Sequence, residues 1–458
     1  MKGKGSGCTP PRESNSQAFG GALDTASVLR VFLKTVSWEL LRFSILFFLA
    51  STVVHASGTV DPAFSRIPFD EWLTQHADSH FRWTAAVAHA QLSFHQRLIS
   101  QIEVEVDGKD LETRRNDGEL VSFFQVTDHE GTRYQGHGAI QLNKLDQNIK
   151  AATVQSDQRA FFLPGDYQLG VVLYDTGTKE HAAIQTKFRI SGPSSAFLTE
   201  AWRGLPSVEF IMDKESPESW YLPDIQGRLD WGKSLQDVPH LDVLLNVVPG
   251  SRRTPSEGLP ALLPTLKVLV QGGPSSEQAE LLDLSRQRAV FHSDAKGIDW
   301  PVLKAALGDS STASIDVHSL SQQHQEAQFF VAQVRRMLRA REDAGNKPVV
   351  LVILSTPVAF ESGEDLSPIS LESLPSCHVF YIRYRAARER ASNPYAQQMG
   401  GRGRGMRMGG PIGRRPVELN VIDQLEATLK PLNPKLFDVE SAEEMTKALT
   451  EIQKAMIH

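Results

Sequence analysis

Four histidines near the N-terminal third are the first residues whose type could do chemistry. His76, His80, His89 and His95 follow one another at intervals of four, nine and six residues. These intervals match no metal-ligand pattern such as HExxH. We therefore expect solvated or hydrogen-bonded histidines here, and no metal site.

Nucleophiles of the common hydrolase and transferase motifs are the next candidates. The sequence contains no GxSxG, Walker A, GxGxxG or CxxC pair, and no Ser, His or Asp stands in a context that activates a nucleophile. Cys377 directly precedes an apolar strand pattern, which indicates a buried and inert thiol. These observations predict a protein that is not an enzyme and has no cofactor. An envelope hydrolase with catalytic residues between two domains is the alternative.

Arginine and glycine dominate one low-complexity segment. Eight arginines and one glutamate between Arg385 and Arg415 give it a local net charge near +7. The pattern predicts a disordered loop at 386–416, with contact to an anionic lipid or polysaccharide surface as one alternative and RNA binding through phosphates and stacking as another. The arginines proposed for anionic contact are Arg402, Arg404, Arg407, Arg414 and Arg415.

The N-terminal segment has the pattern of a signal peptide. A net positive lead precedes a mostly apolar run of 12 residues, Phe43–Val54, and the small residues Val54 and Ala56 occupy the -3 and -1 positions of the expected cleavage site. A spanning helix needs about 20 apolar residues, so this run is short for a permanent anchor. We predict a signal peptide at 1–56 and cleavage after Ala56. A buried core helix and an uncleaved membrane anchor are the alternatives.

Periodicity divides the rest of the chain. Residues 57–95 are predicted to be a partly helical lead-in. Apolar residues then alternate with polar ones over 96–192, most clearly at Tyr167–Leu173 and Ile184–Ile190 around a turn, which predicts an all-β, immunoglobulin-like sandwich. Residues 193–237, rich in Pro, Ser and Trp, are predicted to be a linker. The formal net charge of -6 gives no bulk reason to expect a nucleic-acid partner.

From residue 238 onward, apolar strand patterns alternate with helical ones. Leu241–Val248 and Pro348–Leu354 are nearly continuous apolar runs, and a helix pattern over about 321–342 leads into the second run. This alternation predicts a mostly parallel, doubly wound α/β sheet. The final helix pattern starts with a capping box formed by Ser441 and Glu444.

The region 238–458 resembles a von Willebrand factor A domain. The resemblance rests on the opening strand with its Ser/Gly turn, the long helix before Pro348–Leu354, and the ending Leu436–Met445. The order of signal, sandwich and this domain is similar to the von Willebrand factor A-related proteins of Acidobacteria. This resemblance implies that the chain binds another protein.

The metal-binding motif of that family is broken in this sequence. Family members hold a divalent cation with Asp-x-Ser-x-Ser at the carboxyl edge of the sheet, where hard oxygen ligands suit Mg²⁺. The corresponding stretch here runs from Asn246 to Ser251, and the loop after the later strand contains Ser355 and Thr356 where an Asp is usual. The resemblance therefore implies a metal-free ligand face at Asn246, Ser251, Ser355 and Thr356.

Taken together, these patterns predict an exported protein-binding or scaffolding protein of the bacterial envelope, periplasmic or secreted. Its expected partner is another envelope or extracellular protein, with the Arg-rich loop as a contact to anionic surfaces.

Overall fold

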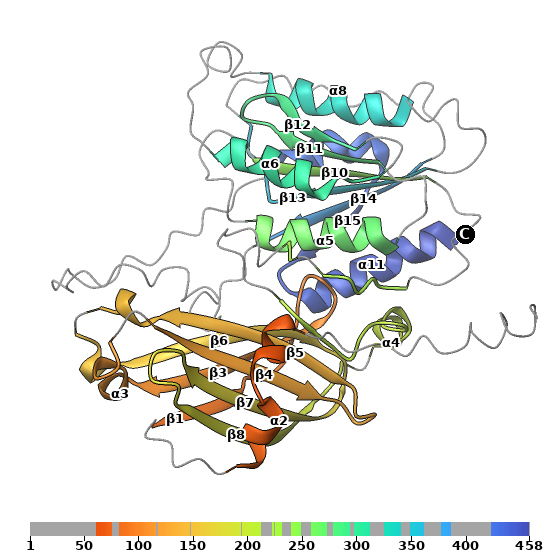
Figure 1. The fold of residues 1–458 in the computed structure, drawn as a ribbon. Coiled ribbons are helices and arrows are strands. Elements are labelled where there is room, and N and C mark those ends of the chain that lie inside the picture. The colour runs from red at the N-terminus through yellow and green to blue at the C-terminus, as the bar shows by residue number, and fades with distance from the viewer. Residues whose placement is uncertain are drawn as a thin grey trace, which may run out of the picture. The chain divides into compact units, whose positions relative to one another are not determined.

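A computed structural model shows how these segments fold (Figure 1). The predicted signal peptide 1–56, Ser251 and the Arg/Gly-rich loop 386–416 lie outside the residues it describes. The described residues are 61–75, 82–115, 118–146, 148–193, 195–211, 222–223, 225–230, 240–248, 258–272, 278–293, 297–311, 325–339, 349–360, 377–385 and 423–457.

The first sheet is antiparallel and is built around β3, which pairs with β1 and β2 on one side and with β6 on the other. Its burial follows the alternation in the sequence, because Ile102 and Val104 are fully buried and Glu103 between them is not. The predicted lead-in therefore contributes strands as well as short helices. The strands of this sheet are β1 (Trp83–Val87), β2 (Gln91–Leu92), β3 (Leu98–Asp107), β6 (Thr153–Phe162) and β9 (Val208–Phe210).

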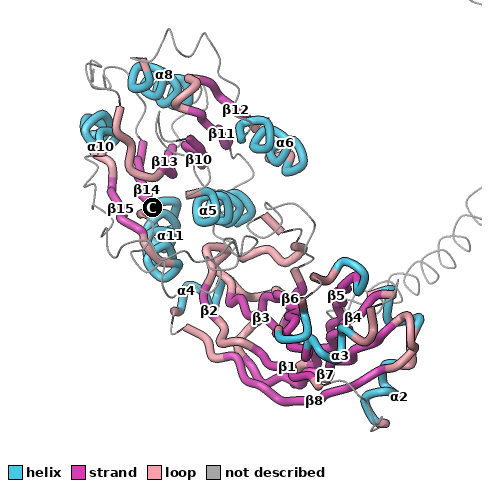
Figure 2. Tube along the Cα trace, turned by 90° about the vertical axis from the view of Figure 1, so that its left-hand side faces the viewer, coloured by secondary structure: helices cyan, strands magenta, loops and turns pink. Residues whose placement is uncertain are grey.

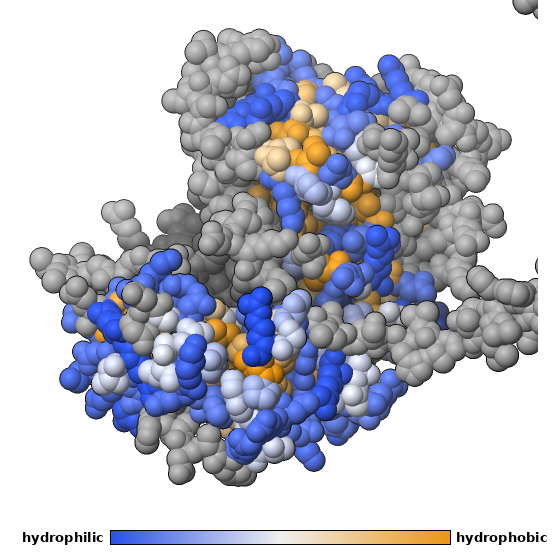
Figure 3. All heavy atoms as spheres, viewed as in Figure 1, coloured by the Kyte–Doolittle hydropathy of each residue, from blue (hydrophilic) through white to orange (hydrophobic). Residues whose placement is uncertain are grey.

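The second sheet is also antiparallel and has the order β5-β4-β7-β8. The predicted hairpin is confirmed as β7 and β8, and Asp175 caps its turn by accepting hydrogen bonds from the backbone N–H groups of Gly177 (2.8 Å) and Thr178 (3.2 Å). In Figure 3 the surface of the part formed by the two antiparallel sheets is mostly hydrophilic, with a hydrophobic patch near its middle. The strands are β4 (Glu119–Thr127), β5 (Arg133–Gln141), β7 (Gly165–Asp175) and β8 (His181–Ile190).

Short helices border the two sheets. Phe64 and Phe69, from the first two of them, pack against Phe123 and Val172 on the outer face of the second sheet. The short helices are η1 (Pro62–Arg66), α2 (Phe69–Thr74), α3 (Gly108–Glu112), η2 (Leu142–Lys144), η3 (Ile149–Ala151) and α4 (Ala196–Ala201).

A third sheet forms the C-terminal part, with the strand order β12-β11-β10-β13-β14-β15. Neighbouring strands are parallel along the order β11-β10-β13-β14-β15. The edge strand β12 runs antiparallel to β11. The two runs predicted as apolar strands are its centre, since every residue of β13 and all but the first of β10 are buried. The strands are β10 (His240–Val248), β11 (Gln278–Asp283), β12 (Arg288–His292), β13 (Val349–Ser355), β14 (Cys377–Tyr384) and β15 (Lys435–Val439).

Helices pack against this third sheet. Figure 2 shows α5, α6 and α11 to one side of the sheet and α8 and α10 to the other. Side chains of the first three helices share one hydrophobic cluster with the sheet, and those of α8 and α10 share another. The helices are α5 (Leu259–Gly272), α6 (Trp300–Ser311), α8 (Glu326–Arg339), α10 (Gln424–Leu429), η7 (Lys430–Leu432) and α11 (Ala442–Ile457).

The predicted fold class is wrong. The described residues form three sheets, two of them wholly antiparallel, and strands contribute more of these residues than helices do. A doubly wound fold of the von Willebrand factor A type needs a helical crossover between successive strands. Here β11 and β12 are joined by a tight turn at 284–287, and the helix before β15 has only six residues. The described part of the chain is mainly β, with one mixed sheet toward its C-terminal end.

Contacts with α11 tie the first sheet to the third within the compact unit Gly58–His458. Gln96, fully buried and with a positive φ of 56°, donates to the carbonyl of Ala442 at 3.2 Å and accepts from the Thr446 hydroxyl at 2.7 Å. The indole of Trp202 donates to the Gln96 carbonyl at 2.7 Å. No described helix is long and apolar enough to cross a membrane.

The capping box of α11 is confirmed, with one difference in its partners. The hydroxyl of Ser441 accepts from the backbone N–H of Glu444 at 3.2 Å, while the Glu444 carboxylate accepts from the N–H of Glu440 at 2.7 Å. Because removing an N-cap side chain costs about 1 kcal/mol, we expect Ser441→Ala to lower the free energy of unfolding by that amount in urea titrations. The control Lys447→Ala, at an exposed position of the same helix, should change it by less than about 0.5 kcal/mol. Equal losses in both variants would refute the role of the cap.

Candidate functional site

The carboxyl ends of four parallel strands meet at one edge of the third sheet, which we call the carboxyl edge. It is formed by the ends of β10, β13, β14 and β15, at Val248, Ser355, Tyr384 and Val439. Side chains from separate stretches of sequence converge at such an edge, where open α/β sheets commonly bind ligands. Three of the four predicted ligand-face residues lie here.

Asn246, Ser355 and Thr356 form a short chain of hydrogen bonds. The Asn246 amide donates to the Ser355 hydroxyl at 3.0 Å, and that hydroxyl donates to the Thr356 carbonyl at 2.6 Å. The prediction that these three residues gather is thus supported by the geometry, whereas Ser251 lies outside the described residues.

Two atoms of this group have no hydrogen-bond partner among the described residues. Asn246 Oδ1 and Thr356 Oγ1 are both buried and unpaired within the described part of the chain. An unpaired buried polar atom costs about 1–3 kcal/mol, and native proteins contain few of them. A ligand at the carboxyl edge could therefore donate a hydrogen bond to Asn246 Oδ1, and could donate to or accept from the Thr356 hydroxyl.

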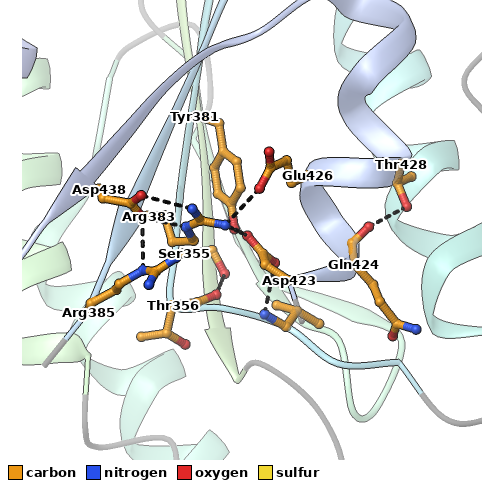
Figure 4. A network of polar contacts seen from close by, with 11 residues as sticks. Ser355, Thr356, Tyr381, Arg383, Arg385, Asp423, Gln424, Glu426, Thr428 and Asp438 are labelled. Carbon is orange, nitrogen blue, oxygen red and sulfur yellow. Dashed lines mark hydrogen bonds and ion pairs between the residues drawn. The ribbon is translucent and has the colours of Figure 1, made fainter. Parts of the chain in front are cut away.

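An ionic cluster around the buried Arg383 lies beside this group, because Arg383 is the β14 neighbour of Ser355 (Figure 4). Its guanidinium binds Asp438 with two hydrogen bonds, from Nε at 2.6 Å and from Nη2 at 3.0 Å. Nη1 donates to Asp423 and to Glu426, both at 2.9 Å. Arg385 adds a second ion pair to Asp438 at 2.9 Å.

Asp423 connects this cluster to the segment that carries Thr356. Its carboxylate accepts from the Tyr381 hydroxyl at 2.8 Å and from the backbone N–H of Val358 at 3.1 Å. Gln424 donates its own N–H to the Val358 carbonyl at 2.8 Å and accepts from the N–H of Phe360. The segment 356–360 is thereby fastened to the start of α10 and, through Arg383, to the sheet.

The pKa shifts of Arg383 and Asp438 both favour their charged forms. Hydrogen bonds from Arg383 hold the pKa of Asp438 below its ordinary value. Burial opposes the charge of Arg383, but its bonds to Asp438 and Asp423 outweigh that effect and raise its pKa. Burial, together with the neighbouring Asp423, raises the pKa of Tyr381 well above its ordinary value. The cluster is therefore suited to holding structure in place, and Tyr381 is not suited to act as a base.

The groups at the carboxyl edge can bind polar ligands, but nothing described there activates a nucleophile. The two partners of the Ser355 hydroxyl are an amide and a carbonyl, and neither takes up a proton at ordinary pH. Among the described residues, no three His, Cys, Asp or Glu side chains gather closely enough to hold a metal ion.

The remaining predicted positions are separate from this edge or outside the description. His95 is buried with its ring against Phe161, at 5.3 Å between centroids, and His89 is exposed. His76 and His80 lie outside the described residues. So do the five loop arginines Arg402, Arg404, Arg407, Arg414 and Arg415.

Sequence reasoning missed the Arg383 cluster, although one signal was present. Tyr381 and Arg383 are polar residues two apart in a strand that is apolar at Val379, Phe380 and Ile382, so they share one face of it. A buried arginine nearly always has an acidic partner, which makes such a residue a marker of an ionic cluster.

Comparisons with known proteins add no identification. Neither a family model nor a curated protein matches the chain. A putative ApaA protein of Bordetella pertussis is 12% identical, and the match covers 25% of this chain and 97% of that one, with a TM-score of 0.18. A structural genomics target solved by X-ray crystallography is 14% identical, with 25% and 89% covered and a TM-score of 0.18. A glycosyl hydrolase family 2 member of Bacteroides cellulosilyticus is 9% identical, with 66% and 42% covered and the same TM-score. These scores are too low to carry an argument about fold or function.

Proposed function

We propose that the chain is an exported protein-binding or scaffolding protein of the bacterial envelope, and that its partner binds at the carboxyl edge of the third sheet. The single observation that carries the binding proposal is the pair of buried, unpaired oxygens of Asn246 and Thr356. Export rests on the positive lead, the apolar run Phe43–Val54 and the small residues before Ser57.

The unpaired oxygens favour a peptide as the ligand. A peptide group offers one N–H donor and one carbonyl acceptor, which fit Asn246 Oδ1 and the Thr356 hydroxyl respectively. Both oxygens are shielded from solvent in the free chain, and Gly258 lies so close that a Cβ there would be 2.7 Å from the Thr356 methyl group. The partner must therefore displace what now shields the edge, and the hydrogen bonds it forms remove the cost of the two unpaired atoms.

The Arg383 cluster supports this role because it fixes the binding segment in advance. Asp423 holds the N–H of Val358, two residues from Thr356, and Arg383 holds Asp423. A segment that is already ordered loses less conformational entropy when a partner binds. Recognition by an amide, a hydroxyl and fixed backbone needs no metal, so binding should survive chelating agents.

Photo-crosslinking tests the binding proposal directly. A photoreactive residue in place of Thr356 should give a discrete adduct with an envelope protein after irradiation, and the adduct should form equally with EDTA present. The same residue in place of Thr199, exposed on α4, is the control and should give none. The same adduct from both positions, or an RNA adduct at position 356, would overturn the proposal.

The export half of the proposal has its own measurement. Mass spectrometry of the fractionated protein should find Ser57 as the first residue of the chain from the envelope or the medium. A chain that keeps its first 56 residues and is recovered from the cytosol would contradict export. The proposal of a binding site is tested separately, by the crosslinking experiment.

A further inference from the structure

A pocket of about 500 Å³ lies at the opposite, amino edge of the third sheet. It arises because β15 begins with Lys435 opposite Phe380, three residues into β14. The first residues of β14, from Cys377 to Val379, therefore have a β13 neighbour but no opposite residue in β15. Asn433, with a φ of 47°, turns the chain into β15 beside this gap.

The pocket combines an apolar wall with a charged rim. The apolar side chains come from β14, η7 and the end of α11, and the charged side chains come from β15 and α11. The apolar lining residues are Val379, Phe380, Leu432 and Ala455, and the polar ones are Cys377, His378, Asn433, Lys435, Glu451 and Lys454.

The charges of the rim are unbalanced. The single carboxylate of Glu451 is shared by two ammonium groups, that of Lys435 at 2.5 Å and that of Lys454 at 2.8 Å. Hydrogen bonds from Lys435 and then Lys454 lower the pKa of Glu451 to about 2, so it stays ionised. The two lysines and the one carboxylate of the lining sum to a net charge of +1, and both lysine side chains remain more than half exposed. Each ammonium has three donors, so both keep donors for a second anion.

We propose that this pocket binds a small organic carboxylate, whose anionic group bridges Lys435 and Lys454 and whose apolar body lies against Phe380 and Ala455. A monoanion balances the surplus charge of the rim, and an apolar body fits the wall beneath it. The site is at the other edge of the sheet from Thr356, so it does not depend on the proposed protein-binding function.

Cys377 makes the pocket measurable, because it is partly exposed rather than buried as its sequence context indicated, it lines the pocket, and the sequence has only one other cysteine, Cys8. In the full-length chain with Cys8→Ser, the rate of Cys377 alkylation by neutral iodoacetamide reports whether the pocket is occupied. Benzoate is the probe, and we expect it to slow alkylation at least about fivefold at saturation. The combined variant Lys435→Gln and Lys454→Gln should need about tenfold more benzoate for half-protection, because both attractive charges are gone.

Two controls separate charge from other effects. Lys447→Gln makes the same change at an exposed position of α11 outside the pocket, and it should keep the wild-type benzoate dependence. Benzamide has the same ring without the charge and should protect poorly. Absence of protection by benzoate, equal protection by benzamide, or the same half-protection in the double lysine variant would each overturn the assignment.

Discussion

Replacing Arg383 with alanine should lower the free energy of unfolding by about 3–5 kcal/mol, the usual cost of removing one partner from a buried ion pair. The Arg383 side chain is 6% exposed and that of Asp423 2%. Without the guanidinium, the Asp423 carboxylate stays buried, and its remaining partners among the described residues are the Tyr381 hydroxyl and the N–H of Val358. Urea unfolding followed by tryptophan fluorescence measures the loss.

Arg385 provides a matched control for that experiment. It binds the same Asp438 carboxylate at 2.9 Å, but its side chain is 45% exposed. Solvent-exposed ion pairs contribute at most about 1 kcal/mol, so Arg385→Ala should have a small effect. Similar losses for the two variants would mean that the burial of Arg383 does not determine how much its ion pairs contribute to the free energy of unfolding.

The same cluster should make stability depend on pH in one direction. The pKa of Asp438 is lower in the folded chain than its unfolded value of about 3.9. A lowered carboxyl pKa gives stability that is present above the unfolded value and is lost as pH falls through the folded value. Unfolding measured between about pH 5 and pH 2 should therefore show a steeper acid loss in the wild type than in Arg383→Ala. Identical slopes would contradict this assignment.

The second large effect is expected at the buried pair of Arg97 and Glu209 in the first sheet. Their side chains are 3% and 8% exposed and meet at 2.5 Å. Arg97 Nε and Nη2 are buried without hydrogen-bond partners in the described structure, and burial lowers the pKa of this guanidinium. Glu209→Ala would leave the charge without its carboxylate and should cost about 3–5 kcal/mol in urea unfolding.

A double replacement distinguishes the cost of an orphaned charge from the value of the pair. Arg97→Met combined with Glu209→Met removes both charges and keeps most of the volume, so much of the lost stability should return. The backbone N–H groups of Gln226 and Gly227 lose their acceptor in this variant, so recovery should be incomplete. Arg82→Ala is a surface control, because the Arg82 side chain is 60% exposed and pairs with Asp110 at 2.9 Å. Its loss should cost at most about 1 kcal/mol. A double variant no more stable than Glu209→Ala would contradict the account.

Local patterns in the sequence predicted local structure well. The hairpin of β7 and β8 was predictable because period-two alternation and the Asp175 turn act within 26 residues, from Gly165 to Ile190. The capping box at Ser441 and the apolar strands β10 and β13 are equally local. In each case neighbouring residues supply the interactions that define the element.

Long-range arrangement could not be predicted in the same way. The predicted fold class was wrong because a pattern of apolar strands separated by helical segments does not determine how many strands lie in each sheet. Nor does it show which strands are joined by tight turns, as β11 and β12 are. The Arg383 cluster was missed because its acidic partners Asp423 and Asp438 lie 40 and 55 residues further along the chain. The convergence of Asn246 and Ser355, 109 residues apart, was expected only through a resemblance.

Thr356→Val tests most directly whether the carboxyl edge is a binding site. The change replaces a buried, unpaired hydroxyl with a methyl group of similar size, so the free chain should be as stable as the wild type or about 1 kcal/mol more stable. Affinity for the partner captured at position 356 should fall about tenfold, the loss of one hydrogen bond, while Thr356→Ser, which keeps the hydroxyl, should bind like the wild type. Unchanged affinity in Thr356→Val, measured by calorimetry beside Thr356→Ser, would contradict the account.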